Sequence, residues 1–121
     1  MSHKVLIADD EPNIVVSLEF MMKREGYEVL VARDGLQALE AIRRERPRLV
    51  LLDAMMPGMT GFDVCEAVRA DEAVRDTLIV MLTAKGRESD VARGTGAGAD
   101  AYVTKPFSTR DLMQKVRDML A

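Results

Sequence analysis

Five polar side chains stand just after short apolar runs in this sequence, and their types point to one kind of chemistry. Three are the carboxylates of Asp9, Asp10 and Asp53, and the others are the hydroxyl of Thr83 and the ammonium of Lys105. Carboxylate oxygens are hard ligands that suit a divalent cation such as Mg²⁺. Hydroxyl and ammonium groups can donate hydrogen bonds to phosphoryl oxygens. Brought together, these residues would suit a divalent cation and a phosphoryl group.

The apolar runs before these side chains have the length and composition of buried strands. They cover residues 5–8, 49–52, 78–82 and 101–104, and consist mostly of Val, Ile, Leu and Ala. Runs of this kind predict strands that are buried on both faces of a parallel sheet. Ligands of open parallel sheets gather at the carboxyl ends of the strands. The polar side chains should therefore converge on one edge.

Strand-like and helix-like stretches alternate five times along the chain. This alternation predicts a single three-layer α/β domain over residues 1–121, with right-handed crossover connections. A further strand is predicted over residues 27–31. The predicted helices cover residues 12–26, 35–45, 62–70, 88–94 and 109–120.

Single residues indicate where two of these helices begin and which face one of them buries. Pro12 suits a first helical position, and Asp34 can cap the second helix. Leu36, Leu39 and Ile42 recur at helical spacing, which predicts that they share a buried face.

Composition narrows the function classes. The 121 residues are 48% apolar, enough to fill one core. A balance of 17 basic against 20 acidic residues gives a net charge of −3, so we expect no direct nucleic-acid binding. Apolar stretches stay shorter than the roughly 20 residues that span a bilayer, and the early first strand leaves no room for a signal peptide. The single cysteine, Cys65, excludes an internal disulfide. We expect a cytoplasmic protein.

Several short motifs accompany the candidate site residues in a fixed order. They are Asp9-Asp10-Glu11, Leu51-Leu52-Asp53, Met56-Pro57-Gly58-Met59 with Gly61, Leu82-Thr83-Ala84, Gly98-Ala99-Asp100, Tyr102, and Lys105-Pro106-Phe107. Each motif is weak alone, but in this order and spacing they resemble the receiver domain of bacterial two-component response regulators over essentially the whole chain. The resemblance implies a flavodoxin-like (βα)5 sandwich whose five-stranded parallel sheet has the order 2-1-3-4-5.

The resemblance also implies the role of each acidic residue. Asp53 would be the phosphoacceptor, forming an aspartyl phosphate without a general base because its carboxylate is already ionised at neutral pH. Asp9, Asp10 and Asp53 would hold Mg²⁺ together with the backbone carbonyl of Met55.

The remaining site residues are assigned in the same way. Thr83 and Lys105 would contact the phosphoryl oxygens, the first as a hydrogen-bond donor and the second as a point charge. Tyr102 would change rotamer as Thr83 moves toward the phosphate, so the two form a predicted switch. Lys105-Pro106 resembles the family's cis peptide, which the sequence alone does not establish.

The implied function is a phosphorylation-controlled binding switch. A sensor histidine kinase or a phosphotransfer protein would supply the phosphoryl group, since His3 is the sole histidine and stands near the terminus. A candidate homodimer face would use the fourth helix, the fifth strand and the fifth helix, although glycines at 94, 96 and 98 weaken that fourth helix. We expect a stand-alone regulator, while the end of the last helix fits a domain boundary equally well. The cognate kinase and the downstream target are not identified.

Two other classes of protein could use part of this pattern. A small Mg²⁺-dependent phosphatase that forms an aspartyl phosphate commonly carries a second acid two residues after the nucleophile, where this chain has Met55. A flavin-binding module needs a phosphate loop after the first strand, where Asp9 and Asp10 would repel the phosphate. Taken singly, the aspartates could also be helix caps or turn formers. The combined pattern favours a signalling switch and not an enzyme.

Some neighbouring residues receive a plainer interpretation. Glu11 stands just before the first helix and is expected to cap it, so it is left out of the predicted site. Met55, Met56 and Met59 are expected mostly to pack their loop, because sulfur is a poor ligand for Mg²⁺. Cys65 lies on a helix face and is expected to be buried.

Overall fold

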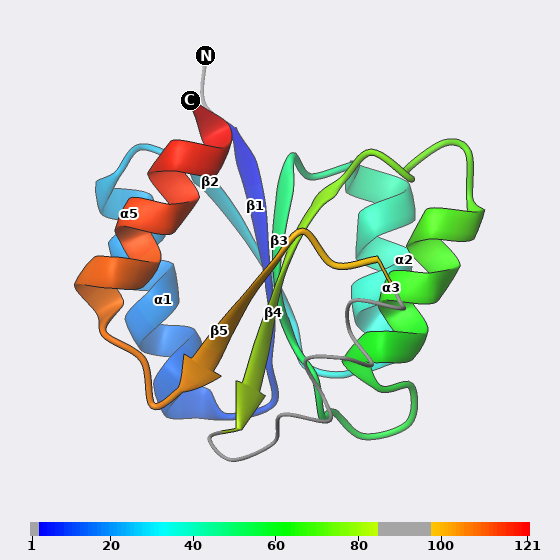
Figure 1. The fold of residues 1–121 in the computed structure, drawn as a ribbon, viewed down its shortest axis with the longest axis horizontal. Helices are drawn as coiled ribbons and strands as arrows, with labels where there is room; N and C mark the ends of the chain where they lie inside the picture. Colours follow the sequence, from blue (N-terminus) through cyan, green and yellow to red (C-terminus); the bar gives the residue numbers. More distant parts are fainter. Residues whose placement is uncertain (1–2, 85–97) are drawn as a thin grey trace.

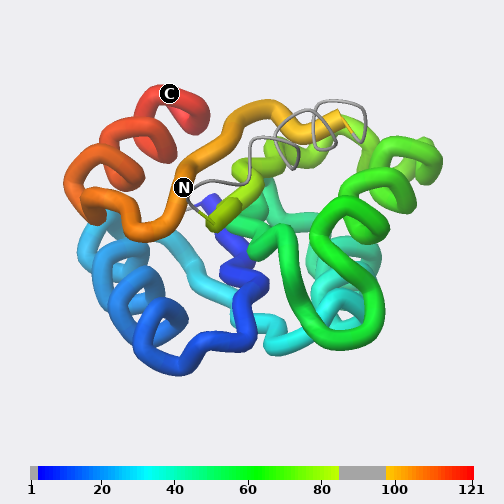
Figure 2. Tube along the Cα trace, turned by 60° about the horizontal axis from the view of Figure 1, so that its bottom comes forward, coloured from blue at the N-terminus to red at the C-terminus, as the bar shows by residue number. Residues whose placement is uncertain are grey.

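A computed structural model describes residues 3–84 and 98–121 of the chain. The strands are β1 (Lys4–Ala8), β2 (Glu28–Ala32), β3 (Leu49–Asp53), β4 (Leu78–Ala84) and β5 (Ala101–Lys105), and the helices are α1 (Pro12–Arg24), α2 (Gly35–Glu45), α3 (Gly61–Ala70) and α5 (Thr109–Leu120). The strands form one sheet between two helical layers (Figure 1). Helices α1 and α5 cover one face, and α2 and α3 cover the other (Figure 2).

The sheet confirms the predicted topology. Its order is β2-β1-β3-β4-β5, and each neighbouring pair is parallel. Leu6 at the centre of β1 lies opposite Leu30 of β2 and Val50 of β3. This arrangement is the flavodoxin-like fold, and it aligns the carboxyl ends of the strands along one edge. The helix predicted over residues 88–94 lies outside the described residues.

Strand side chains alternate between two core clusters, one under each helical layer. Both clusters are drawn mostly from the central strands β1, β3 and β4, which explains why the sequences of these strands are apolar almost without interruption. Toward α2 and α3 the strands bury Leu6, Ala8, Ala32, Val50, Leu52, Ile79 and Met81. Toward α1 and α5 they bury Val5, Ile7, Leu49, Leu51, Val80 and Leu82.

The buried face of α2 differs from the prediction in one residue. Leu39 and Ile42 are buried as expected, but Leu36 is 57% exposed. The small residues Gly35 and Ala38 are buried in its place and let the helix approach its neighbours closely. Since successive residues turn by about 100° around a helix, Leu36 is carried off the face that Gly35 occupies. The prediction for Leu36 was therefore wrong.

Side-chain caps fix the helices that flank the site edge. The Asp34 carboxylate accepts a hydrogen bond of 2.8 Å from the backbone N–H of Gln37, as predicted. At the start of α3, Thr60 and Asp63 form a reciprocal capping box. These caps hold α2 and α3 in position against the loop that follows β3.

Candidate functional site

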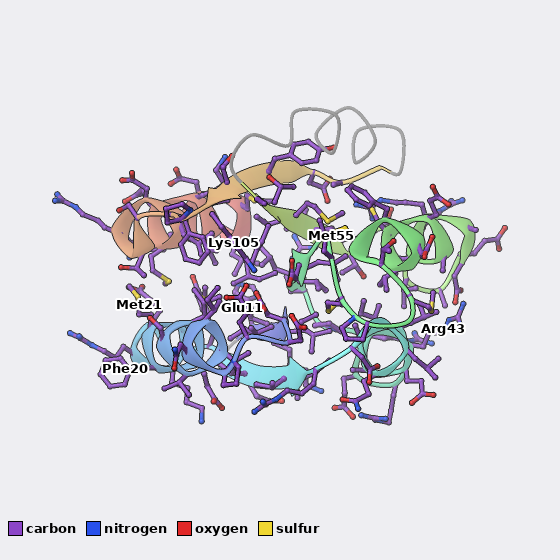
Figure 3. All side chains as sticks on the ribbon, turned by 90° about the horizontal axis from the view of Figure 1, so that it is seen from below. Glu11, Phe20, Met21, Arg43, Met55 and Lys105 are labelled. Carbon is purple, nitrogen blue, oxygen red and sulfur yellow. The ribbon has the colours of Figure 1, made fainter. Side chains whose placement is uncertain are left out.

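The predicted site residues gather at the carboxyl edge of the sheet. Asp9 follows β1, Asp53 is the last residue of β3, and Lys105 is the last residue of β5, while Thr83 is the next-to-last residue of β4. Figure 3 looks onto this edge and shows Lys105 and Met55 near the middle, between the two helical layers. The parallel strands thus bring together side chains from positions far apart in the sequence.

Three carboxylates form an acidic cluster that fits a divalent cation. Asp9, Asp10 and Asp53 each offer an oxygen, and these oxygens lie within 4.8 Å of one another. Asp9 is fully buried and Asp53 is 6% exposed, whereas Asp10 is exposed. Crowded carboxylates repel one another when they are ionised, and a hard cation with oxygen ligands would relieve that repulsion. The donor set therefore fits Mg²⁺, and Asp10 leaves one side open to solvent.

Lys105 reaches into the cluster from β5. Its ammonium donates hydrogen bonds of 3.0 Å to Asp9 Oδ2 and 3.0 Å to Glu11 Oε1, and it lies 3.4 Å from Asp53 Oδ2. Burial lowers the pKa of Lys105, but these hydrogen bonds and the nearby acidic charges outweigh it and raise the pKa above its ordinary value. Lys105 is therefore held as a cation beside Asp53.

Glu11 was left out of the predicted site, but the structure places its carboxylate against Lys105. It occupies the N-cap position of α1, but among the described residues its carboxylate makes no capping hydrogen bond and bonds to Lys105 instead. The backbone N–H of Glu11 donates to Asp9 Oδ1 at 2.9 Å. A signal was present in the sequence, because Glu11 continues the Asp9-Asp10 motif. Its hydrogen-bond partner could not be predicted from the sequence, because Lys105 is 94 positions away.

The environment of Asp53 disfavours its ionised form. Burial, followed by the charge of Asp9, raises the pKa of Asp53 to about 6, although Lys105 and a hydrogen bond from the backbone N–H of Met55 act in the opposite direction. At neutral pH and without a cation, Asp53 is therefore ionised in the folded protein, and this buried charge lowers the stability of the fold.

That raised pKa predicts how Asp53→Asn changes stability with pH. Between pH 4 and 6 the folded state retains a proton on Asp53 that the unfolded chain has released, so stability falls as pH rises through this window. An asparagine does not titrate. Without a divalent cation, Asp53→Asn should therefore raise the free energy of unfolding at pH 7.5 by on the order of 1–2 kcal/mol, and the gain should vanish near pH 4.

Urea unfolding in EDTA at the two pH values measures this difference. The exposed Asp76 provides the matched control, because Asp76→Asn removes the same charge at the surface. A gain for Asp53→Asn that is equal at pH 4 and pH 7.5 would contradict the prediction.

The loop after β3 is held close to Asp53. The backbone N–H of Met55 donates to Asp53 Oδ1 at 3.2 Å, and the backbone N–H of Gly61 donates to the carbonyl of Ala54 at 2.9 Å. As predicted, Met56 is buried and Met59 packs against the core, while Met55 is 48% exposed. The loop therefore places Met55 beside the acceptor, and its carbonyl remains a predicted ligand.

Two glycines allow this loop to fit. A Cβ added at Gly61 would overlap with the carbonyl oxygen of Asp53, and a Cβ added at Gly35 would overlap with backbone and side-chain atoms of Met59. The obstacles are mostly backbone atoms, which move only if the loop itself moves. The N-termini of α2 and α3 thus press directly on the loop that carries Met55.

Gly61→Ala should therefore disturb both stability and the site. The fold should lose about 1–3 kcal/mol, as for overpacking of a tight interior, despite the higher helix propensity of alanine. Because the overlap is with Asp53 itself, Mg²⁺ affinity should fall as well. Gly26→Ala is the control, since that position has a φ of 89° and no neighbour that a Cβ would meet. Gly26→Ala should lower stability, but its Mg²⁺ affinity in calorimetric titration should equal that of the wild type. If Gly61→Ala also binds Mg²⁺ with wild-type affinity, the steric argument is refuted.

Thr83 and Tyr102 lie on the same face of the sheet. Thr83 pairs with Thr104 in the β4–β5 register, and Met81 pairs with Tyr102, so the two residues are diagonal neighbours. Thr83 is 1% exposed, and Tyr102 packs against the cluster beneath α2 and α3. This geometry is compatible with the predicted switch, which stays a prediction.

The Lys105–Pro106 peptide bond is cis.

A tie between α3 and the start of β5 was not foreseen from the sequence. The Arg69 guanidinium pairs with Asp100 Oδ2 at 2.7 Å and donates to the carbonyls of Gly98, Arg75 and Thr77 at 2.8, 2.6 and 2.7 Å. Asp100 belongs to a motif noted in the sequence, but its partner is 31 positions away. This tie anchors the strand that carries Tyr102 and Lys105.

Cys65 is fully buried in α3, as predicted. Burial raises the pKa of its thiol to about 11, so the thiol is protonated at neutral pH.

Across residues 3–84 and 98–121, no helix is both long and apolar enough to cross a membrane.

Comparisons with known proteins agree with this fold. The family model of the response regulator receiver domain matches residues 5–117. The DNA-binding response regulator MtrA of Mycolicibacterium smegmatis is 48% identical over 120 residues, which cover 99% of this chain and 51% of that protein. The chain thus spans about half the length of the curated relatives it matches.

Two solved structures extend the comparison. The chemotaxis response regulator CheY4 of Vibrio cholerae superposes with a TM-score of 0.91 at 32% identity, covering 98% of this chain and 99% of that one. The receiver domain of a sensor histidine kinase from Pseudomonas aeruginosa, with a magnesium ion coordinated in its active-site cleft, gives a TM-score of 0.90 at 28% identity and covers 99% and 98% of the two chains. This chain therefore belongs to the response regulator receiver domain family of two-component signal transduction.

Proposed function

We propose that this chain is a signalling switch that accepts a phosphoryl group on Asp53. The observation that carries the proposal is the position of Asp53, which stands within one cluster with Asp9 and Asp10 and 3.4 Å from the Lys105 ammonium. A nucleophilic carboxylate, a cation-binding set and a fixed positive charge are the parts that phosphoryl transfer to an aspartate needs.

The transfer itself would proceed in line at Asp53. A carboxylate oxygen attacks the phosphorus, an O–P bond forms as the N–P bond of a phosphohistidine breaks, and the departing imidazole keeps the bonding pair. Lys105 and Thr83 bind the equatorial oxygens. Asp9, Asp10, Asp53 and the Met55 carbonyl would hold Mg²⁺, whose charge would offset the repulsion between acceptor and donor. The magnesium ion in the Pseudomonas aeruginosa receiver supports this assignment.

The phosphoryl group would then bias an equilibrium between two conformations. Thr83 and Tyr102 would couple the site to the surface formed by β5 and α5, which the candidate homodimer face would share with the predicted fourth helix. The donor would be a sensor histidine kinase or a phosphotransfer protein. We place the chain in the cytoplasm, and we propose that it acts as a switch and not as an enzyme with an external substrate.

A direct role in DNA binding is not part of the proposal. MtrA is a DNA-binding protein about twice as long as the segment that matches this chain. With a net charge of −3, this chain offers little attraction for a nucleic acid. The phosphatase alternative is not supported, because the proteins compared above are response regulators or receiver domains.

Incubation of the purified chain with acetyl phosphate and Mg²⁺ tests the proposal. One phosphoryl group should be incorporated, and it should be lost in both acid and base, as an acyl phosphate is. Borohydride reduction followed by peptide mapping should locate it at Asp53. A label that survives acid and base, or that maps to another residue, would overturn the assignment.

A further inference from the structure

The Lys105 ammonium is shared among three carboxylates of the described residues, and a phosphoryl group on one of them, Asp53, would compete with the other two for its N–H donors. An ammonium has three N–H donors, and three carboxylates surround it within the described residues. Asp9 and Glu11 accept hydrogen bonds of 3.0 Å each, and Asp53 lies at 3.4 Å. A phosphoryl group on Asp53 takes over the N–H that now faces the Asp53 carboxylate. A second hydrogen bond from Lys105 to the phosphoryl oxygens requires that Asp9 or Glu11 give way.

The burial of the partners indicates which one gives way. The Asp9 side chain is 0% exposed, so it would lose its ammonium partner without gaining water, and only the cation that it is proposed to bind would offset that loss. The Glu11 side chain is 57% exposed and can exchange the ammonium for water at little cost. Figure 3 shows Glu11 and Lys105 close to each other at this edge of the sheet. Glu11 is therefore the partner that Lys105 releases most easily.

We infer that Glu11 is a positioning residue that competes with the phosphoryl oxygens for Lys105 and so lowers the phosphoryl occupancy of Asp53. In the unphosphorylated protein, Glu11 holds Lys105 at the mouth of the site. When the phosphoryl group arrives, its oxygens replace Glu11 as acceptors. The inference rests on the proposed function, and it assigns to Glu11 a regulatory effect on the same site.

Beryllofluoride, which mimics an acyl phosphate on aspartate, provides the measurement. Its dissociation constant in excess Mg²⁺ is obtained by calorimetry, and ¹⁹F spectra report the donors around the bound fluorines. Glu11→Gln should bind beryllofluoride about 1.5- to 5-fold more tightly, the factor expected when an exposed ion pair no longer competes. Glu11→Asp should also bind more tightly, because its shorter side chain keeps the charge but does not reach Lys105.

A second background separates competition for Lys105 from simple repulsion. In Lys105→Met there is no ammonium to withhold, so the gain from Glu11→Gln should shrink by at least half. The ¹⁹F signals should differ between wild type and Lys105→Met, and Glu11→Gln should keep the wild-type pattern. Glu40→Gln, which removes an exposed charge from α2, is the control and should bind beryllofluoride as the wild type does.

The outcomes distinguish the inference from the proposed function. If the wild type binds no beryllofluoride, the proposed phosphoacceptor site itself is wrong. If the wild type binds it and Glu11→Gln binds equally or more weakly, the role of Glu11 is wrong while the site stands. If Glu11→Gln binds more tightly but Glu11→Asp does not, charge repulsion explains the gain and competition is overturned.

Discussion

Asp53→Asn is expected to abolish phosphoryl incorporation from acetyl phosphate. The amide has nearly the same shape as the carboxylate but lacks the anionic oxygen that attacks phosphorus. Asp9 is fully buried and bonded to Lys105, and Asp10 is the exposed member of the cluster, so neither matches the position of Asp53 at the end of β3 beside Lys105 and the Met55 N–H. The residual incorporation should fall to the background level in mass spectrometry.

The matched control for this experiment is Asp76→Asn, an exposed aspartate that should leave incorporation unchanged. Far-UV circular dichroism of Asp53→Asn should match that of the wild type, so that loss of labelling is not loss of fold. Labelling of Asp53→Asn at the wild-type level would show that the acceptor lies elsewhere.

Mg²⁺ should raise the melting temperature of the wild type, and Asp10→Ala should remove most of that rise. A ligand that binds only the folded state adds about 2.7 kcal/mol at a concentration of 100 times its Kd. Asp10→Ala deletes one oxygen ligand and one of three crowded charges. In EDTA, therefore, the variant should melt at or above the wild-type temperature, because repulsion within the cluster is reduced.

Thermal unfolding in EDTA and in Mg²⁺ compares the two proteins directly. Asp118→Ala removes an exposed carboxylate from α5 and should keep the full response to Mg²⁺. The double variant that lacks both Asp10 and Asp53 should show no response. Equal stabilisation of the double variant and the wild type would place the cation at another site.

The positions of the main site residues could be predicted because they depend on strand geometry. Each strand is short, apolar and followed by a polar residue, so its carboxyl end can be found from the sequence alone. Alternation then places Asp9, Asp53 and Lys105 on the same side of their strands, the side of α1 and α5. The order of the strands could not be predicted in this way, because periodicity predicts only that strands and helices alternate. The correct order came from the family resemblance.

What could not be predicted depends on partners far apart in the sequence or on how tightly two elements pack. The contact between Arg69 and Asp100 and the contact between Glu11 and Lys105 exist only because the folded sheet brings these distant positions together. Leu36 has the spacing of a core residue, but the close packing allowed by Gly35 turns it outward. A local sequence pattern shows whether a residue is apolar, but it does not show how closely its helix packs against the rest of the protein.

The two glycines that admit the loop after β3 also bear on the entropy of cation binding. With Gly35 and Gly61 pressed against Met59 and Asp53, the loop carrying Met55 has little conformational freedom once the chain is folded. Its ordering entropy is then lost during folding and need not be lost again when the proposed ligands close around a cation. Cation affinity at this edge is thereby tied to the integrity of two helix starts, neither of which supplies a ligand.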